Sequence, residues 1–234
     1  MKKPMILFAI GVASLVILFQ SCNENASDEK ELKSSNKEEA INVTKVERKD
    51  RLKLNTENMQ AAYKGETTAH FKYEAYSKKA MEEGHPEIAL LFKAASGAEL
   101  IHAENHKVVL VRMGESIPLI KPEFTVKSTV ENLKEAINGE SYEFNTMYPE
   151  FIKNANTAGN YMSQISLTYA YKVEQKHRDF YKGALAALEA GTDDKLPEIY
   201  FLCPTCGNTY ATSAPSRCEI SMTNSKLFIR VTNL

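Results

Sequence analysis

The sequence predicts a mainly α-helical protein, with a four-helix bundle over residues 54–192 and a small β domain built on a cysteine knuckle over residues 198–234. Three observations predict this fold class. The segment 57–66 recurs at 131–140 with five of ten positions identical, and a Glu-x-x-His pattern follows each copy. A duplication of that length indicates a paired-helix unit used twice. Finally, a Cys-Pro-x-Cys-Gly pattern near the C-terminus indicates a tight turn that presents two thiols.

Composition and charge restrict the classes of protein to consider. The 234 residues include 29 basic and 30 acidic side chains, which gives a formal net charge of −1. This balance argues against a nucleic-acid partner, which requires a concentrated basic surface. Four cysteines are too few for a disulfide scaffold, and 43% hydrophobic residues are enough for a buried core.

Residues 1–22 predict a lipoprotein-type signal peptide. Lys2 and Lys3 precede the apolar run 5–19, and Cys22 follows a small serine as an expected lipidation site. The apolar run is short for a membrane span, and the alternative is an uncleaved N-terminal anchor. Both interpretations predict an exported, membrane-anchored protein on the periplasmic or outer-membrane side. Residues 23–53 are highly charged with few large apolar groups, which predicts a flexible tether.

The first half of the bundle predicts two helices. Good helix formers fill residues 56–83, with Thr56 as a possible cap and Gly84-His85-Pro86 as the stop. Residues 87–113 have apolar positions near helical spacing and end at Gly114. The connection that follows contains Pro118 and Pro122, and its length indicates a crossover between two helix pairs.

The second half predicts two further helices. Ser128 and Glu131 form a capping-box pattern at the start of a third helix, which runs to about residue 157 with a kink near Pro149. After a break at 156–160, a fourth helix runs to Ala190. Together the four helices predict a bundle with one long crossover.

Glu and His residues occupy matching places in the two halves. In a helix, Glu-x-x-His places a carboxylate and an imidazole on one face. Two such pairs with one inward Glu from each remaining helix form the ligand pattern of ferritin-like di-iron proteins. The predicted ligands are Glu66, Glu99, His102, Glu140, Glu174 and His177. These ligand types suit iron, manganese or zinc, and bridging carboxylates can hold two ions together.

The other histidines have simpler interpretations. Glu82 and His85 also match Glu-x-x-His, but the pattern crosses Gly84, so no helix aligns the pair. A lone pair of this kind is usually a surface pair. His70 and His106 lie outside the repeat and are expected to be ordinary packing or surface residues.

Over residues 54–234 the sequence resembles rubrerythrin. The motifs that carry the resemblance are Lys64-Gly65-Glu66, Glu82-Glu83-Gly84, Glu99-x-x-His102-Ala103-x-Asn105-His106, Gly139-Glu140-x-Tyr142-Glu143, Met147-Tyr148-Pro149-Glu150-Phe151 and Glu174-x-x-His177. The resemblance implies a ferritin-like bundle, a two-iron centre and a rubredoxin-like C-terminal domain. It also implies that Glu143 is a seventh ligand, and that one iron shifts between His102 and Glu143 as the pair changes oxidation state. Tyr73 and Tyr148 match tyrosines that line the family's site, although core packing explains them equally well.

The C-terminal knuckle departs from the family pattern. Cys203, Cys206 and Cys218 match three ligands of a rubredoxin-like iron site, but Ser221 stands at the fourth ligand position. A serine oxygen is a harder and poorer iron ligand than a thiolate. Three alternatives are open: iron bound by three cysteines with Ser221 or water, zinc, or a disulfide between Cys203 and Cys206.

The resemblance implies a non-haem di-iron peroxidase that reduces hydrogen peroxide to water in oxidative-stress defence. Electrons would arrive through the rubredoxin-like domain, often that of a partner subunit in a homodimer, from an unknown donor. One alternative is a metal-sequestering module without turnover, favoured by the missing cysteine and the expected export. A ferroxidase that uses oxygen is a further alternative, because it needs the same ligands.

Overall fold

The computed structural model describes residues 26–232 of the chain. The predicted signal peptide and Cys22 therefore lie outside the described residues. The chain divides into two compact units, Met1–Lys45 and Val46–Leu234, and the second unit contains the bundle and the C-terminal domain. Over the described residues, helices that combine the length and the hydropathy needed to cross a bilayer are absent.

The first helix, α1, covers Ala26–Glu82 and so begins well before Thr56, where the sequence analysis placed its start. Low apolar content predicted that residues 23–53 bury no core, but it does not prevent a helix. Acidic and basic side chains one turn apart stabilise this helix by pairing. Examples are Arg51 Nη1 with Glu47 Oε2 at 3.8 Å and Lys53 Nζ with Glu57 Oε1 at 3.7 Å. The function of this segment as a tether stays a prediction.

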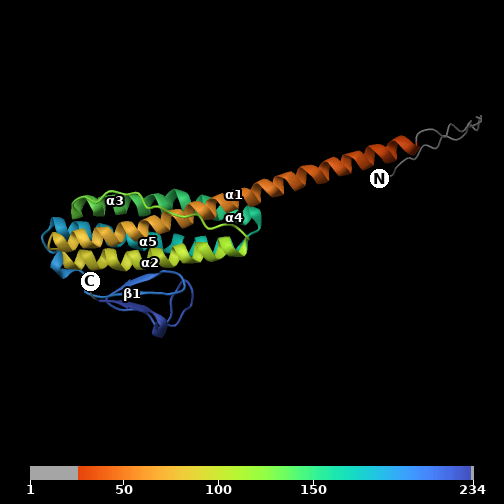
Figure 1. Cartoon of the computed structure of the whole chain (residues 1–234). Helices are drawn as coiled ribbons and strands as arrows, with labels where there is room; N and C mark the ends of the chain where they lie inside the picture. Colours follow the sequence, from red (N-terminus) through yellow and green to blue (C-terminus); the bar gives the residue numbers. More distant parts are fainter. Residues whose placement is uncertain (1–25, 233–234) are drawn as a thin grey trace, which may run out of the picture. The chain divides into compact units, whose positions relative to one another are not determined.

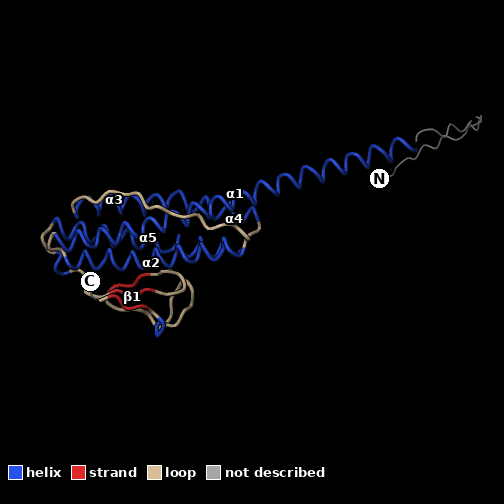
Figure 2. The backbone as a smooth tube through the Cα atoms, viewed as in Figure 1, coloured by secondary structure: helices blue, strands red, loops and turns tan. Residues whose placement is uncertain are grey.

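The next helix and the crossover follow the sequence prediction. Helix α2 covers Pro86–Arg112 with proline in its first turn, where a missing N–H costs no hydrogen bond. Residues 113–128 form an extended connection that runs along the bundle, drawn in tan (Figure 2). Helix α3 covers Thr129–Tyr142, and its capping box is formed by Ser128 and Glu131 in both directions.

The third arm of the bundle is interrupted just before Pro149. Helix α3 passes into a π-helical turn, η1 (Glu143–Met147), and then into α4 (Tyr148–Ala158). Pro149 lies in the first turn of α4, so the irregularity is in the residues that precede it. Such π turns occur often at functional sites. Helix α5 covers Tyr161–Glu189 and begins at Asn160, whose side chain accepts a hydrogen bond from the Ser163 N–H.

The C-terminal domain packs against the bundle beside α2 and α5 (Figure 1). After a short 3-10 turn, η2 (Asp193–Lys195), it forms the antiparallel strands β1 (Tyr200–Leu202), β2 (Thr209–Ala211) and β3 (Ile229–Val231) in the order β2-β1-β3. A further turn, η3, covers Ser225–Leu227. Gly97 of α2 permits this packing, because an added Cβ there would lie 2.8 Å from the Leu202 side chain.

Candidate metal centre

The four arms of the bundle bring the six repeated Glu and His residues together in the core. Helix α1 provides Glu66, α2 provides Glu99 and His102, α3 provides Glu140, and α5 provides Glu174 and His177. None of them is more than 1% exposed. Their predicted ligand atoms form two overlapping groups, each within 4.8 Å, and both groups contain Glu99 and Glu174. Two shared carboxylates between two ligand groups are the arrangement that two bridged metal ions require.

Both imidazoles turn the same nitrogen toward the carboxylates. His102 Nδ1 lies 2.8 Å from Glu99 Oε2 and 3.2 Å from Glu174 Oε1. His177 Nδ1 lies 2.9 Å from Glu99 Oε1 and 3.3 Å from Glu174 Oε2. The Nδ1 atoms therefore face the space between the carboxylates, and the Nε2 atoms point away from it.

The donor set of this site fits a pair of metal ions. Within the described part of the chain, the Oε2 atoms of Glu66 and Glu140 and both carboxylate oxygens of Glu174 are buried without a hydrogen-bond partner. Burial and the neighbouring carboxylates raise the pKa of Glu66 and Glu140 well above the usual range. Burial lowers the pKa of His102, but Glu174 and Glu99 outweigh it and raise that pKa to about 10. Buried charge of this kind is stable only when it is neutralised, and two divalent cations would do so.

Glu143, the seventh ligand implied by the resemblance, lies at the edge of the site. It begins the π turn, is only half-buried and belongs to neither ligand group. Its Oε1 lies 3.9 Å from the point where a Cβ on Gly65 would be. Burial, then Glu174 and Glu99, raises the pKa of Glu143 to about 8. Its function as a ligand stays a prediction.

Two tyrosines donate hydrogen bonds to the predicted ligands. Tyr73 Oη lies 2.6 Å from Glu140 Oε1, and Tyr148 donates to Glu66 Oε1. Both tyrosines are at most 2% exposed. The structure therefore favours a place in the site over core packing alone, the choice that the sequence left open.

His106 is a buried core residue, within the packing role that the sequence analysis expected, and it also contacts the site. It is fully buried beside the site, with Nε2 3.2 Å from Tyr148 Oη and Nδ1 2.7 Å from Ser166 Oγ. Burial, and then His102, lowers the pKa of His106 to about 3, so its imidazole is neutral. The available signal was its position four residues after His102, which places both on one face of α2.

The other two histidines lie outside the metal site: His70 serves packing, as expected, and His85 pairs with Asp193 rather than with Glu82. His70 Nδ1 lies 2.8 Å from Ser96 Oγ, between α1 and α2. His85 precedes α2 and lies 2.7 Å from Asp193 Oδ2, outside the metal site.

The C-terminal knuckle gathers its three cysteines and Ser221. The sulfurs of Cys203, Cys206 and Cys218 lie within 4.8 Å of one another, and all three cysteines are free. Ser221 Oγ lies 3.2 Å from Cys203 Sγ and 2.8 Å from Thr223 Oγ1. The hydrogen bond with Cys206 lowers the pKa of Cys203 to about 4, so this sulfur is available as a thiolate. Three thiols and one hydroxyl can hold one metal ion.

The knuckle also contacts the outer side of the bundle's histidines. His102 Nε2 lies 3.1 Å from the carbonyl oxygen of Cys206, and His177 Nε2 lies 3.0 Å from Thr209 Oγ1. These partners direct the N–H to Nε2 and leave Nδ1 free to bind metal. Gly207 makes the approach possible, because a Cβ there would lie 2.7 Å from His102 Cδ2.

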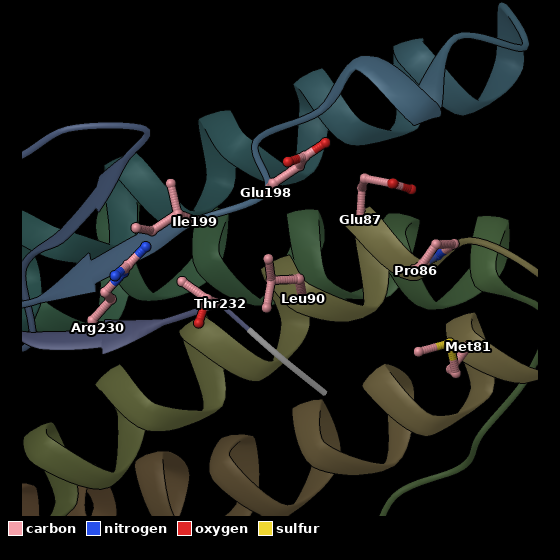
Figure 3. Close-up of a pocket in the computed structure, with 8 residues that line it drawn as sticks. All are labelled: Met81, Pro86, Glu87, Leu90, Glu198, Ile199, Arg230 and Thr232. Atoms are coloured by element: carbon pink, nitrogen blue, oxygen red, sulfur yellow. The ribbon is translucent and has the colours of Figure 1, made fainter.

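A surface pocket of about 600 Å³ lies elsewhere, where the helix ends meet the C-terminal strands (Figure 3). Its lining includes Met81, Leu90, Glu198 and Arg230, and none of the predicted ligands. The metal centre is therefore not a surface pocket but part of the bundle core.

The bundle, its buried Glu and His residues and the small sheet define a ferritin-like protein with a rubredoxin-like C-terminal domain. The rubrerythrin family model matches residues 57–185. The chain belongs to the rubrerythrin family.

Individual relatives agree with this assignment. Nigerythrin of Nitratidesulfovibrio vulgaris is 37% identical over 167 residues, which cover 70% of this chain and 80% of that protein. Rubrerythrin-2 of Clostridium acetobutylicum is 31% identical, covering 69% of this chain and 88% of its own length. The solved structure of fully reduced, all-ferrous nigerythrin matches with a TM-score of 0.68 and 34% identity, covering 75% of this chain and 86% of that one.

Proposed function

We propose that this protein is a non-haem di-iron peroxidase that reduces hydrogen peroxide to water. Membership of the rubrerythrin family supports the broader statement, a di-iron oxidoreductase of oxidative-stress defence. The observation that carries the proposal is the pair of overlapping ligand groups that share Glu99 and Glu174 in the bundle core.

Two ferrous ions bound there would supply the two electrons that cleave the oxygen–oxygen bond of hydrogen peroxide. The chain supplies ligands and surroundings for this chemistry. Glu99 and Glu174 face both histidine Nδ1 atoms, and burial of all six residues restricts access of water. Glu143 at the half-buried edge is suited to join or leave the ligand set, as the family resemblance implies.

The knuckle is suited to return electrons to the centre. Cys206, a candidate ligand of the knuckle metal, contacts the Nε2 of His102 through its own carbonyl oxygen. This short route lies within one chain, whereas the family resemblance implies a partner's domain in many members. The homodimer and the external electron donor stay predictions.

Stopped-flow mixing of the ferrous-loaded protein, prepared from residue 23 onward, tests the proposal. We expect oxidation by hydrogen peroxide to be much faster than oxidation by oxygen. Faster oxidation by oxygen would assign the protein to the ferroxidases. Insensitivity to both would leave a metal-sequestering module, the alternative that Ser221 in the knuckle favours. A matched control is the same preparation loaded with zinc, which is not redox-active.

We further propose that the protein is exported and anchored through a lipid on Cys22. This proposal rests on the sequence of residues 1–22 alone. Cells grown with labelled palmitate should label the wild-type protein and not Cys22→Ser. Labelling of both proteins would contradict the anchor.

A further inference from the structure

A continuous chain of hydrogen bonds connects the surface of the bundle with the ligand Glu66. Ser166 Oγ of α5 lies 2.7 Å from His106 Nδ1 of α2. His106 Nε2 lies 3.2 Å from Tyr148 Oη, and Tyr148 donates to Glu66 Oε1. The four residues come from four different parts of the bundle, so only the folded structure brings them into line.

With a neutral His106, the hydrogen that Tyr148 donates to Glu66 gives every hydrogen bond in this chain the same direction. Tyr148 has one hydroxyl hydrogen, and it goes to the Glu66 carboxylate, so the phenol oxygen must accept from His106 Nε2–H. A neutral imidazole protonated on Nε2 has a lone pair on Nδ1, which accepts from the Ser166 hydroxyl. Each donor therefore points from the surface toward Glu66.

The outer end of the chain opens into a depression of about 200 Å³ between α2 and α5. Ser166 lines it and is 5% exposed, whereas Glu66 at the inner end is 0% exposed. The rim is largely apolar, with Val108 and Ile165 both about half exposed. Ser166 therefore lines this depression with a small part of its surface exposed, whereas Glu66 is fully buried.

The other half of the duplicated site differs. Tyr73 donates to Glu140, as Tyr148 does to Glu66. The rings that pack around Tyr73 are Tyr76, Phe92 and Tyr181, all 0% exposed. No described imidazole packs against Tyr73 in place of His106, and the tyrosine leads into the aromatic core rather than to solvent.

We propose that Ser166, His106 and Tyr148 form a proton path from solvent to the metal centre. The inference rests on the proposed peroxidase function, because splitting hydrogen peroxide into two waters consumes two protons and two electrons. Two ferrous ions held by the predicted ligands would supply the two electrons, one from each ion on oxidation to the ferric state. A proton enters at Ser166 Oγ from water and displaces one along the chain, so that one passes from Tyr148 to Glu66 Oε1. This passage leaves the His106 hydrogen on Nδ1, and the Nε2 tautomer must be restored before the second proton passes. No member of the path changes its net charge.

The first test does not depend on activity. In the zinc-loaded, ¹⁵N-histidine-labelled protein, nitrogen NMR should show His106 as the neutral tautomer with its hydrogen on Nε2. A hydrogen on Nδ1, or on both nitrogens, would overturn the path, because its donors would no longer point one way.

The second test uses His106→Gln, whose amide can still donate to Tyr148 but cannot accept a proton on one side and release it on the other. The matched control is His70→Gln, which removes the imidazole of a similar His–Ser contact away from the site. With iron content equal to wild type, His106→Gln should slow oxidation of the ferrous protein by peroxide by about tenfold or more and increase its solvent isotope effect in D₂O.

His70→Gln should keep both the wild-type rate and the wild-type isotope effect. A wild-type rate in His106→Gln at full iron content would refute the path while leaving the peroxidase proposal intact. Failure of the wild-type protein to react with peroxide would instead refute the proposed function. If His106→Gln does not bind iron, the tautomer measured in the wild-type protein decides.

Discussion

The missing side chain of Gly207 lets the knuckle lie against the metal centre, and replacing this glycine with alanine tests that contact. Gly207 has a φ of +76°, a conformation that costs an alanine about 1–2 kcal/mol. Its added Cβ would also lie 2.7 Å from His102 Cδ2 and 3.1 Å from the Ala98 carbonyl oxygen. Neither neighbour can yield freely, because one is a predicted metal ligand and the other is helix backbone.

The two effects add to a substantial loss of stability. Overpacking of this kind costs about 1–3 kcal/mol. With the backbone cost, we expect Gly207→Ala to lower the free energy of unfolding by about 3 kcal/mol. For a chain of this size that corresponds to a fall in Tm of roughly 6–12 °C. The hydrogen bond between His102 Nε2 and the Cys206 carbonyl should be lost with it.

The assay is thermal unfolding of the zinc-loaded protein followed by circular dichroism. Gly191→Ala is the matched control, since its φ is +65° but nothing lies within 4 Å of an added Cβ. This control should cost only the backbone term of about 1–2 kcal/mol, or roughly 2–8 °C. Equal losses in the two variants would refute the contact between the knuckle and His102 of the same chain.

Three further predictions concern the metal sites. The double variant Glu174→Ala/His177→Ala should lose binuclear iron by elemental analysis, because it removes a shared carboxylate and an imidazole; unchanged iron content would contradict the assigned centre. Iron-loaded Ser221→Cys should gain the red colour and visible absorption bands of a four-sulfur iron site, and identical bands in the native protein would show that the serine does not weaken the site. The pKa of Glu143 is raised to about 8 from an ordinary 4.5, so the folded metal-free protein holds this proton longer than the unfolded chain does. The free energy of unfolding of the metal-free protein should therefore fall as pH rises from about 4.5 to about 8. Zinc affinity should rise over the same range, because zinc binding displaces protons. A Tm of the metal-free protein that rises with pH would contradict the burial of Glu143.

The internal duplication is visible in the ligands but not in their surroundings. Both halves provide one Glu, one Glu-x-x-His pair and one tyrosine that donates to a ligand. Tyr148, which donates to Glu66, contacts His106, whereas Tyr73, which donates to Glu140, packs against aromatic rings. We therefore expect the two metal positions to differ in access to protons.

Local geometry lets the sequence alone predict the six candidate ligands and most of the helix boundaries around them. A spacing of three residues places Glu99 and His102 on one face of any α-helix, and the repeat at Glu174 and His177 supplies the second pair. The capping box at Ser128 likewise depends only on neighbouring residues.

The surroundings of those predicted ligands depend on tertiary packing. The contact of His106 with Ser166 joins residues 60 positions apart, and that of His102 with Cys206 joins residues 104 positions apart. No local pattern specifies such pairs, because they depend on how whole helices and the sheet pack together. The early start of α1 was missed for a different reason, since a charged segment with no core to bury can still form a helix through its own side-chain pairs.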